Sequence, residues 1–380
     1  MKRIGLWAVV LCLATTVLRG ADAPAHPTLA LGSDAPDFDL PGVDGQNHTL
    51  AEYARADVLC VVFNCNHCPT AQAYEERIKA LSRRFTAPKV AVVVISPNSS
   101  AAVRLDELGF SDVGDTLDEM KIRAKERGFN FPYLYDGENC AVAKKYGPVA
   151  TPHAFVFDRA RKLRYVGRID DNERESLVKS HDLADAIEAL VAGRTPTVAQ
   201  TKVFGCSTKW DSKVEGNTRW LEKVRKEPVK LDAITAAGLK ELVSQPSGKV
   251  RMIHLWATWC GPCVSEFDEI VETNLRFRHR DFELITVAAQ FPDEQAKVER
   301  FLQKNHSSAR NLIFADTDKY KMMEALDAKW SGELPYTLLV GADGRVLHRF
   351  DGALDFIELR RHIVAALNAV TPWKPATAPL

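Results

Sequence analysis

The sequence has no excess of charge of either sign. Its 50 lysine and arginine residues balance 50 aspartate and glutamate residues, so its formal net charge at pH 7 is zero. A protein that binds nucleic acid or an anionic membrane through its overall charge carries a basic excess. The composition therefore gives no reason to expect nucleic acid as a partner. With 46% hydrophobic and 26% charged residues, it is that of an ordinary globular protein.

The chain also lacks an apolar run long enough to cross a bilayer comfortably. The nearest candidate is a 14-residue run, residues 4–17, which follows Lys2 and Arg3 and precedes small residues at 20–23. A positive start, a short apolar run and a small-residue end are typical of a secretory signal peptide. We therefore expect residues 1–23, with Cys12, to be removed. The mature chain would be periplasmic or secreted, without a membrane span. A retained N-terminal anchor is the alternative.

Cysteine is scarce, yet four of the 8 cysteines form two pairs with the spacing Cys-x-x-Cys. The later pair, Cys260 and Cys263, follows the apolar, β-prone run 250–256 and precedes a helical pattern of apolar residues at 264–271. A helix N-terminus stabilises a thiolate through its dipole and its free N–H groups. We predict that Cys260 attacks a disulfide and that Cys263 resolves the mixed disulfide. A zinc site or a structural disulfide is the alternative.

The earlier pair, Cys65 and Cys68, has similar surroundings. The apolar run 58–63 precedes it and a helical pattern at 70–85 follows it. We assign Cys65 the role of nucleophile and Cys68 that of resolving thiol. His67 lies between them, and an imidazolium there would stabilise the Cys65 thiolate. A solvent-facing histidine without a role is the alternative.

The two pairs belong to a duplication that covers most of the chain. Each is followed, further along, by a proline at the start of a strand pattern, Pro152 in the first half and Pro335 in the second. A turn and a second strand pattern come next in both halves, and the repeat predicts two α/β domains. The predicted parts are a signal peptide (1–23), a first domain (27–192), a connector (193–229), a second domain (230–370) and a tail (371–380).

The second half closely resembles thioredoxin at its active site. The preceding Ala257-Thr258 is similar to the periplasmic, TlpA-like branch of that family. The resemblance implies a thioredoxin-like fold of three layers, α/β/α. It also implies that Pro335 is cis, packs against the cysteine pair and presents the backbone of Leu334 to an incoming peptide. An ordinary proline at a strand entry is the alternative. The residues that match the thioredoxin active site are Trp259, Cys260, Gly261, Pro262 and Cys263.

One position departs from thioredoxin. That family carries a buried acid on the strand, six residues before the first cysteine, as a proton relay. The residue at this position is His254. A histidine could move protons or be a neutral core residue, and the sequence leaves both interpretations open.

The first half resembles bacterial redoxins of the peroxiredoxin-like or thioredoxin-like kind. The resemblance implies the same fold, with Pro152 cis and the backbone of Thr151 open to a peptide. A peroxiredoxin has threonine or serine three residues before its peroxidatic cysteine. If Cys68 is that cysteine, the position is Cys65. A thiol orients a peroxide poorly, so we favour disulfide exchange over peroxide reduction. The matching motifs, between about residues 31 and 210, lie at 63–69, 96–98, 151–153, 167–172 and 205–210.

These sites predict an extracytoplasmic thiol–disulfide oxidoreductase that acts on protein dithiols and disulfides. It needs an external redox partner but no bound cofactor or metal. We expect the first site to be the more oxidising, with electrons running to it from Cys260 and Cys263. One alternative is a thiol peroxidase with the second domain as its reductant. Another is a Cu(I) or other metal chaperone that uses Cys65, His67 and Cys68.

Three further cysteines have no partner assigned. Cys60 lies in the middle of a predicted strand and is expected to be a buried, inert thiol. Cys140 and Cys206 are candidates for a third disulfide or a resolving thiol, and the sequence does not decide between these roles. Nor does it identify the client proteins, the electron donor or acceptor, or the oligomeric state.

Overall fold

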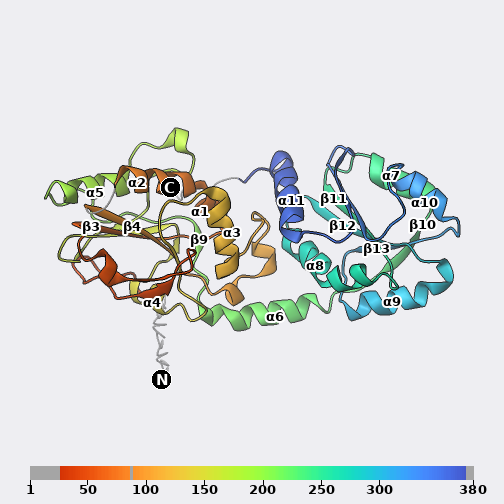
Figure 1. Ribbon diagram of the computed structural model, residues 1–380, viewed down its shortest axis with the longest axis horizontal. Helices are drawn as coiled ribbons and strands as arrows, with labels where there is room; N and C mark the ends of the chain where they lie inside the picture. The colour runs from red at the N-terminus through yellow and green to blue at the C-terminus, as the bar shows by residue number, and fades with distance from the viewer. Residues whose placement is uncertain (1–25, 86–88, 374–380) are drawn as a thin grey trace, which may run out of the picture.

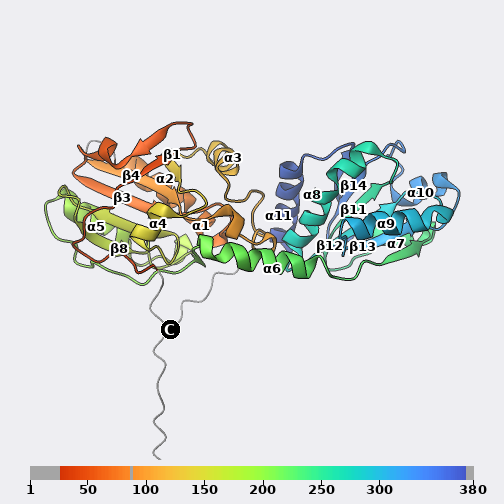
Figure 2. The same cartoon turned by 90° about the horizontal axis from the view of Figure 1, so that it is seen from below.

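A computed structural model describes residues 26–85 and 89–373 of the chain. Two α/β lobes follow one another along its long axis, and helix α6 (Val214–Val224) runs beside both of them (Figures 1 and 2). The predicted signal peptide and the last residues of the predicted tail lie outside the described ranges. Among the residues described, no helix combines the length and apolar character that a membrane span requires.

The first lobe is built on a five-stranded mixed sheet. In spatial order its strands are β5 (Tyr133–Tyr135), β4 (Val90–Ser96), β3 (Val58–Phe63), β7 (His153–Phe157) and β8 (Leu163–Gly167). β3 pairs in parallel with β4 and antiparallel with β7. Every residue of β3 is buried, as expected for a continuous apolar run at the centre of a sheet. A hairpin of β1 (Asp39–Pro41) and β2 (Asn47–Thr49) precedes the sheet.

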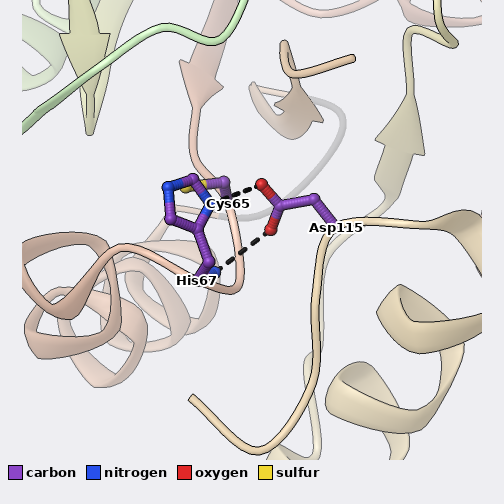
Figure 3. Close-up of side chains that lie close together, drawn as sticks. All are labelled: Cys65, His67 and Asp115. Atoms are coloured by element: carbon purple, nitrogen blue, oxygen red, sulfur yellow. Dashed lines mark hydrogen bonds and ion pairs between the residues drawn. The ribbon is translucent and has the colours of Figure 1, made fainter. Parts of the chain in front are cut away.

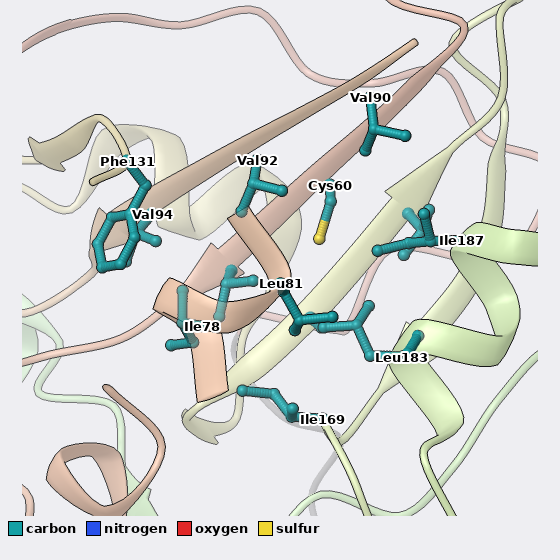
Figure 4. Close-up of a cluster of buried hydrophobic side chains, with 14 of the residues drawn as sticks. Cys60, Ile78, Leu81, Val90, Val92, Val94, Phe131, Ile169, Leu183 and Ile187 are labelled. Carbon is teal, nitrogen blue, oxygen red and sulfur yellow. The ribbon is translucent and has the colours of Figure 1, made fainter. Parts of the chain in front are cut away.

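Helices cover both faces of this sheet, because successive side chains of a strand point to opposite sides. Cys60 and Val62 of β3 face α2 and α5, and α3 also contributes to this core (Figure 4). Val61 and Phe63 face the other way, against α4. Burial raises the pKa of Cys60 to about 12, and its buried position is confirmed. The helices are α1 (Pro69–Ala73), α2 (Glu75–Arg84), α3 (Leu117–Arg127), α4 (Ala141–Tyr146) and α5 (Asp182–Val191).

The second lobe repeats this plan on a six-stranded sheet. In spatial order its strands are β10 (Leu231–Ile234), β13 (Arg310–Phe314), β12 (Phe282–Ala288), β11 (Val250–Trp256), β14 (Tyr336–Val340) and β15 (Val346–Asp351). The central strand β11 pairs in parallel with β12 and antiparallel with β14. Both lobes are therefore three-layer α/β/α folds, which confirms the predicted fold class.

The helices of the second lobe divide between the two faces of its sheet. Met252 of β11 packs with α8 and α11, whereas Ile253 packs with α7 and α10 on the opposite face. α9 joins the N-terminal half of α8 around Trp256. The helices are α7 (Ala236–Ser244), α8 (Gly261–Phe277), α9 (Gln295–Lys304), α10 (Lys319–Leu326) and α11 (Phe356–Val370).

The first part of the expected connector packs against the first lobe. Strand β9 (Cys206–Ser207) pairs antiparallel with β6 (Ala150–Thr151), which directly precedes β7. The Lys209 backbone N–H donates to Asn98 Oδ1 at 2.9 Å. Trp210 packs against the core under α4. The chain leaves the first lobe only after these residues, and α6 then leads to the second lobe (Figure 1).

The lobes also touch through α8. Its Arg276 is only 3% exposed, and its Nε donates to the carbonyl oxygens of Leu108 and Ser111, both at 3.3 Å. Arg280 Nη1 donates to the carbonyl oxygen of Gly109 at 2.9 Å. The end of α8 that contacts the first lobe is its C-terminal end.

Candidate redox sites

The second cysteine pair lies at the N-terminus of α8, as predicted. Cys260 is the N-cap residue, and its Sγ accepts a hydrogen bond from the Cys263 backbone N–H at 3.3 Å. The two cysteines form a disulfide with a Cα–Cα distance of 5.3 Å. Cys260 is slightly more exposed than Cys263, at 6% against 0%. The sulfur of Cys260 therefore lies where helix N–H groups stabilise a thiolate.

The surroundings of this pair also match the thioredoxin-like expectation. The Leu334–Pro335 peptide bond is cis, and Leu334 packs against the cluster that holds both cysteines. Among the described residues, the Leu334 backbone makes no hydrogen bond to another segment. Trp259 and Phe291 are exposed apolar side chains, and the ammonium of Lys319 lies over both rings, 5.7 and 4.5 Å from their centroids.

His254 is fully buried in the core, which favours the neutral one of the two interpretations that the sequence left open. Burial lowers its pKa to about 3, and its Nδ1 lies 2.9 Å from Thr337 Oγ1. Its Nε2 lies 3.8 Å from Oε1 of Glu266, and neither atom has a hydrogen-bond partner among the described residues. Burial raises the pKa of Glu266. Sequence reasoning missed Glu266, although its place three residues after Cys263 puts both side chains on one face of α8.

The first cysteine pair lies three residues earlier than the second pair when both are counted from the central strand of their own sheet. The residue after each cis proline pairs with the central strand, His153 with Phe63 and Tyr336 with Leu255. Cys68 lies five residues after Phe63, just as Cys260 lies five residues after Leu255. Cys68 is therefore the structural equivalent of Cys260, and Cys65 corresponds to Ala257.

The expectation that Cys65 lies at the helix N-terminus is wrong. Cys68 is the N-cap of α1, and its Sγ accepts a hydrogen bond from the Ala71 backbone N–H at 3.4 Å. The reason is Pro69, which lacks an N–H and is favoured at the first position of a helix, where that donor has no partner in any case. The helix therefore begins after the second cysteine of this pair and not after the first.

The electrostatics of the pair agree with this register. Burial alone would raise the pKa of Cys68, yet that pKa lies well below its ordinary value. Thiols of Cys206 and Cys65 donate hydrogen bonds to its sulfur, and His67 adds a nearby positive charge. Burial and the hydrogen bond to Cys68 raise the pKa of Cys65 well above its ordinary value. The lowered pKa and the N-cap position both favour Cys68 over Cys65 as the more acidic thiol of this site.

His67 is held by a carboxylate that the sequence did not reveal. Its Nδ1 lies 2.6 Å from Oδ2 of Asp115, and Oδ1 of Asp115 accepts from the His67 backbone N–H at 3.1 Å (Figure 3). Burial would lower the pKa of His67, but the Asp115 charge raises it above its ordinary value. His67 is 2% exposed, so the solvent-facing alternative is wrong. Its positive charge lowers the pKa of Cys68, whereas the pKa of Cys65, the thiolate expected from the sequence, is raised.

Residues 31–166 match the AhpC/TSA family, and residues 230–360 match the family described as Redoxin. The chain is a tandem of two thioredoxin-fold domains from these families. The AhpC/TSA domain contains Cys65 and Cys68, and the Redoxin domain contains Cys260 and Cys263.

Named relatives of this tandem protein work in thiol chemistry. "Thiol-disulfide oxidoreductase ResA" of Bacillus subtilis (strain 168) is 28% identical over 113 residues, and "Thiol:disulfide interchange protein CycY" of Rhizobium leguminosarum bv. viciae is 28% identical over 138 residues. These matches cover 30% and 36% of this chain, and the chain spans only 58% and 65% of the relatives' lengths. A crystal structure of a hypothetical protein from Sinorhizobium meliloti 1021 is 34% identical, with a TM-score of 0.43, over 48% of this chain and 96% of that one.

The cis proline of the AhpC/TSA domain does not present an open backbone edge. The Thr151–Pro152 bond is cis, and Thr151 Oγ1 lies 3.2 Å from Cys65 Sγ. The Thr151 backbone, however, is paired with Cys206 in β9. The expectation that Thr151 is free to bind a peptide is therefore wrong, because the chain itself occupies that position. Cys206 packs against Cys65 and Cys68.

The other thiols lie apart from this cluster. Cys140 is buried beside α4, and burial raises its pKa to about 11. Within residues 26–85 and 89–373, the donor set that could hold a metal ion is Cys65, His67 and Asp115, whose ligand atoms lie within 4.8 Å of one another. Asp115 replaces Cys68 in the set expected for a Cu(I) chaperone. A carboxylate is a hard ligand that does not favour Cu(I).

Proposed function

We propose that the Redoxin domain is a thiol–disulfide oxidoreductase in which Cys260 exchanges disulfides with cysteines of protein substrates. The observation that carries this proposal is the position of Cys260, disulfide-bonded to Cys263 at the N-cap of α8 and packed with the residue before a cis proline. The names of the relatives support the reaction class.

The reaction balances with the residues present. In the reduced domain the Cys260 thiolate attacks a substrate disulfide, bonds to one substrate sulfur and releases the other as a thiolate. Cys263 then loses its proton and attacks Cys260 Sγ. The substrate leaves as a dithiol, and the Cys260–Cys263 disulfide re-forms. Glu266 is the carboxylate that lies on the Cys263 face of α8, and we assign it the proton that Cys263 must lose.

The surface around Cys260 supports a protein substrate. Trp259, the residue before Cys260, is 57% exposed, and the exposed ring of Phe291 shares the Lys319 ammonium with it, so exposed apolar rings lie on the side of the least buried sulfur of the pair. The backbone of Leu334, which no other segment of the described chain pairs with, offers hydrogen-bonding groups to an extended peptide. A small thiol would use neither feature.

The test is the rate at which the full-length protein catalyses the reduction of insulin disulfides by dithiothreitol. Cys260→Ser is expected to abolish the contribution of the Redoxin domain. Cys140→Ser, which removes a buried thiol outside both sites, is the matched control and should retain the full rate. The decisive comparison uses a protein that carries Cys65→Ser and Cys68→Ser, so that only the Redoxin domain can react. If adding Cys260→Ser to that protein leaves its rate unchanged, the proposal is refuted.

In the AhpC/TSA domain we propose Cys68 as the nucleophile and Cys65 as a resolving thiol, the reverse of the order expected from the sequence. The low pKa of Cys68 and its N-cap position support this order. The same observations favour a second candidate function, peroxide reduction. Attack of the Cys68 thiolate on a peroxide oxygen would break the O–O bond, leave Cys68 as a sulfenic acid and release water. Condensation with Cys65 would release a second water and form a disulfide.

Consumption of hydrogen peroxide by the pre-reduced protein distinguishes the two candidates for this domain. Peroxidase activity requires rapid consumption that is lost in Cys68→Ser and kept in Cys260→Ser during a single turnover. Disulfide exchange alone predicts consumption no faster than that of a free thiol.

Either reaction is proposed to take place outside the cytoplasm, as supported by the signal-peptide pattern of residues 1–23. N-terminal analysis of the mature protein from a periplasmic fraction tests that location.

A further inference from the structure

The AhpC/TSA domain contains a third thiol in the position that a substrate cysteine would take. Strand β9 pairs antiparallel with β6, so that Cys206 lies opposite Thr151, the residue before the cis proline. A peptide substrate of a thioredoxin fold is expected to add to this backbone edge, as Leu334 in the other domain leaves it free to do. Cys206 packs against Cys68 and Cys65, so the segment brings a thiol as well as a backbone to the site.

The chain holds β9 in this place by several contacts. Gly205 has a φ of +140°, and a Cβ there would lie 2.1 Å from the carbonyl oxygen of Thr151. Only glycine allows so close an approach. Thr208 Oγ1 donates to the carbonyl oxygen of Pro148 at 2.6 Å, and Lys209 N–H donates to Asn98. These bonds fix both sides of Cys206 against the domain.

Access to solvent separates Cys206 from the other two thiols. Cys65 is 1% and Cys68 0% exposed, whereas Cys206 is partly exposed. A protein partner therefore reaches the sulfur of Cys206 more easily than either sulfur of the Cys-x-x-Cys pair. Cys60 and Cys140 are buried elsewhere and do not belong to the cluster.

We propose that Cys206 is a third redox-active cysteine, a built-in substrate thiol that exchanges with the Cys65–Cys68 pair and transfers its oxidation state to an external protein dithiol. This inference rests on the proposed thiol–disulfide chemistry of the AhpC/TSA domain and adds the residue through which that domain meets its partner.

The exchange is balanced in atoms and electrons. Starting from a Cys65–Cys68 disulfide, the Cys206 thiolate attacks Cys68 Sγ. A Cys68–Cys206 bond forms, the Cys65–Cys68 bond breaks, and Cys65 leaves as a thiolate that takes up the proton lost by Cys206. No external oxidant takes part in this step. One thiol of an external protein dithiol then attacks the sulfur of the partly exposed Cys206, and Cys68 leaves. The second thiol of the partner resolves the mixed disulfide, so the partner is oxidised and Cys206 is reduced.

Cys68 is the suitable sulfur to leave in the last step. Disulfide exchange is faster when the leaving thiol is the more acidic one and when the attacked sulfur is accessible. The helix N-terminus and His67 stabilise the departing Cys68 thiolate. In the proposed Cys68–Cys206 disulfide, Cys206 therefore supplies the more accessible sulfur and Cys68 the better leaving group.

The experiment uses the full chain with Cys260→Ser and Cys263→Ser, so that only the AhpC/TSA domain reacts. The reduced protein is oxidised with one equivalent of diamide, quenched in acid, alkylated and digested with trypsin. A Cys68–Cys206 disulfide joins the peptide 203–209 to the peptide 56–77, and fragment mass spectra of the linked pair assign the bond to Cys68 and not to Cys60 or Cys65, which the same peptide contains. The rate of re-reduction by dithiothreitol, the dithiol probe, is measured on the same sample. Cys206→Ser is the test variant and Cys140→Ser the matched control.

The proposal expects the linked peptides in the parent protein and in Cys140→Ser. It expects re-reduction to slow by about tenfold or more in Cys206→Ser, because the probe must then attack a buried sulfur. Absence of the link overturns the proposal whatever the rates are, and this mapping needs no variant at Cys206. A link with unchanged rates also overturns it. If Cys65–Cys68 still forms in these cases, the proposed thiol chemistry of the domain stands. If no disulfide of Cys68 forms, both proposals fail.

Discussion

Cys68 and Cys260 occupy equivalent positions in the two domains. Each is the N-cap of the helix that follows the central strand, and each sulfur accepts a hydrogen bond from the backbone N–H three residues on, at 3.4 and 3.3 Å. The other cysteine of the first site, Cys65, precedes the N-cap cysteine in the chain, whereas Cys263 of the second site follows it. The N-cap cysteine is therefore the second cysteine of the first pair and the first cysteine of the second pair.

The geometry of α8 opposes direct electron transfer between the two sites within one chain. Cys260 lies at its N-terminus, and Arg276, which contacts the first lobe, lies near its C-terminus. At about 1.5 Å per residue these two positions are about 24 Å apart along the helix. The expected internal relay from Cys260 to the first site therefore has no short path along α8.

The nucleophile of the Redoxin domain can be trapped. Cys263→Ser removes the resolving thiol, so the mixed disulfide between Cys260 and a substrate should accumulate, whereas Cys260→Ser should form none. Non-reducing gel electrophoresis after incubation with a disulfide-containing protein provides the measurement. Equal trapping by both variants would contradict the assigned order.

The charge of His67 is expected to keep Cys68 ionised. In the protein with Cys260→Ser and Cys263→Ser, His67→Ala should raise the pKa of Cys68, and Asp115→Asn should do the same because it removes the charge that keeps His67 protonated. Thiolate absorbance at 240 nm against pH measures this. His181→Ala, an exposed histidine, is the control. The same loss of thiolate stabilisation should make the site less oxidising, so its reduction potential should fall in His67→Ala. An unchanged titration would show that the Cys206 and Cys65 thiols suffice.

Glu266 is expected to act as the proton acceptor of Cys263. Glu266→Gln keeps the shape of the side chain and should slow turnover by about tenfold or more, because general-base groups contribute at least that much. Asp268→Asn, an exposed acid on the same helix, should leave the rate unchanged. Since the Glu266 pKa is raised, the wild-type rate should fall at a higher pH than an ordinary carboxylate would impose, and this limb should vanish in Glu266→Gln. A rate that is equal in both variants would remove Glu266 from the mechanism.

Acid is expected to destabilise the Redoxin domain through His254. Its pKa of about 3 in the folded state lies below that of an unfolded histidine, so the unfolded chain binds the extra proton between these values. The stabilising effect of keeping His254 neutral is complete above about pH 6.5 and is lost by about 1.4 kcal/mol per pH unit below it. His254→Asn should flatten this slope in urea unfolding curves, and His306→Asn, an exposed position, should not. A slope that survives in His254→Asn would assign it to other groups.

The first folding unit is proposed to extend beyond the boundary expected at residue 192. A fragment of residues 26–213 should fold, whereas 26–194 should be less stable by about 2 kcal/mol or more, because it loses the burial of Trp210 and the β9 pairing. Thermal unfolding followed by circular dichroism compares the two fragments. Equal stability would return residues 195–213 to the role of a linker.

The sequence by itself determined the duplication and the strand-to-helix placement of the Redoxin pair, and its resemblance to thioredoxin-like families implied the two cis prolines. These features are local, because an apolar run, a Cys-x-x-Cys spacing and a proline before a strand are adjacent along the chain. The same local pattern misled at the first pair. Cys65 and Cys68 have the same spacing as Cys260 and Cys263. Because Pro69 is the first residue of α1, however, this helix begins after the second cysteine of its pair, three residues later than the pattern of the second pair predicts.

Only the tertiary structure decided what surrounds the first site. Asp115 comes from the loop before α3 and Cys206 from the segment after α5, and no periodicity connects either of them to His67 or Cys68. Their approach depends on strand pairing and on burial, which raises the energy of an unpaired charge and so selects partners distant in sequence. For the same reason the state of His254 was open until its neighbours were known, since its pKa depends on the packing around it and not on its own chemistry.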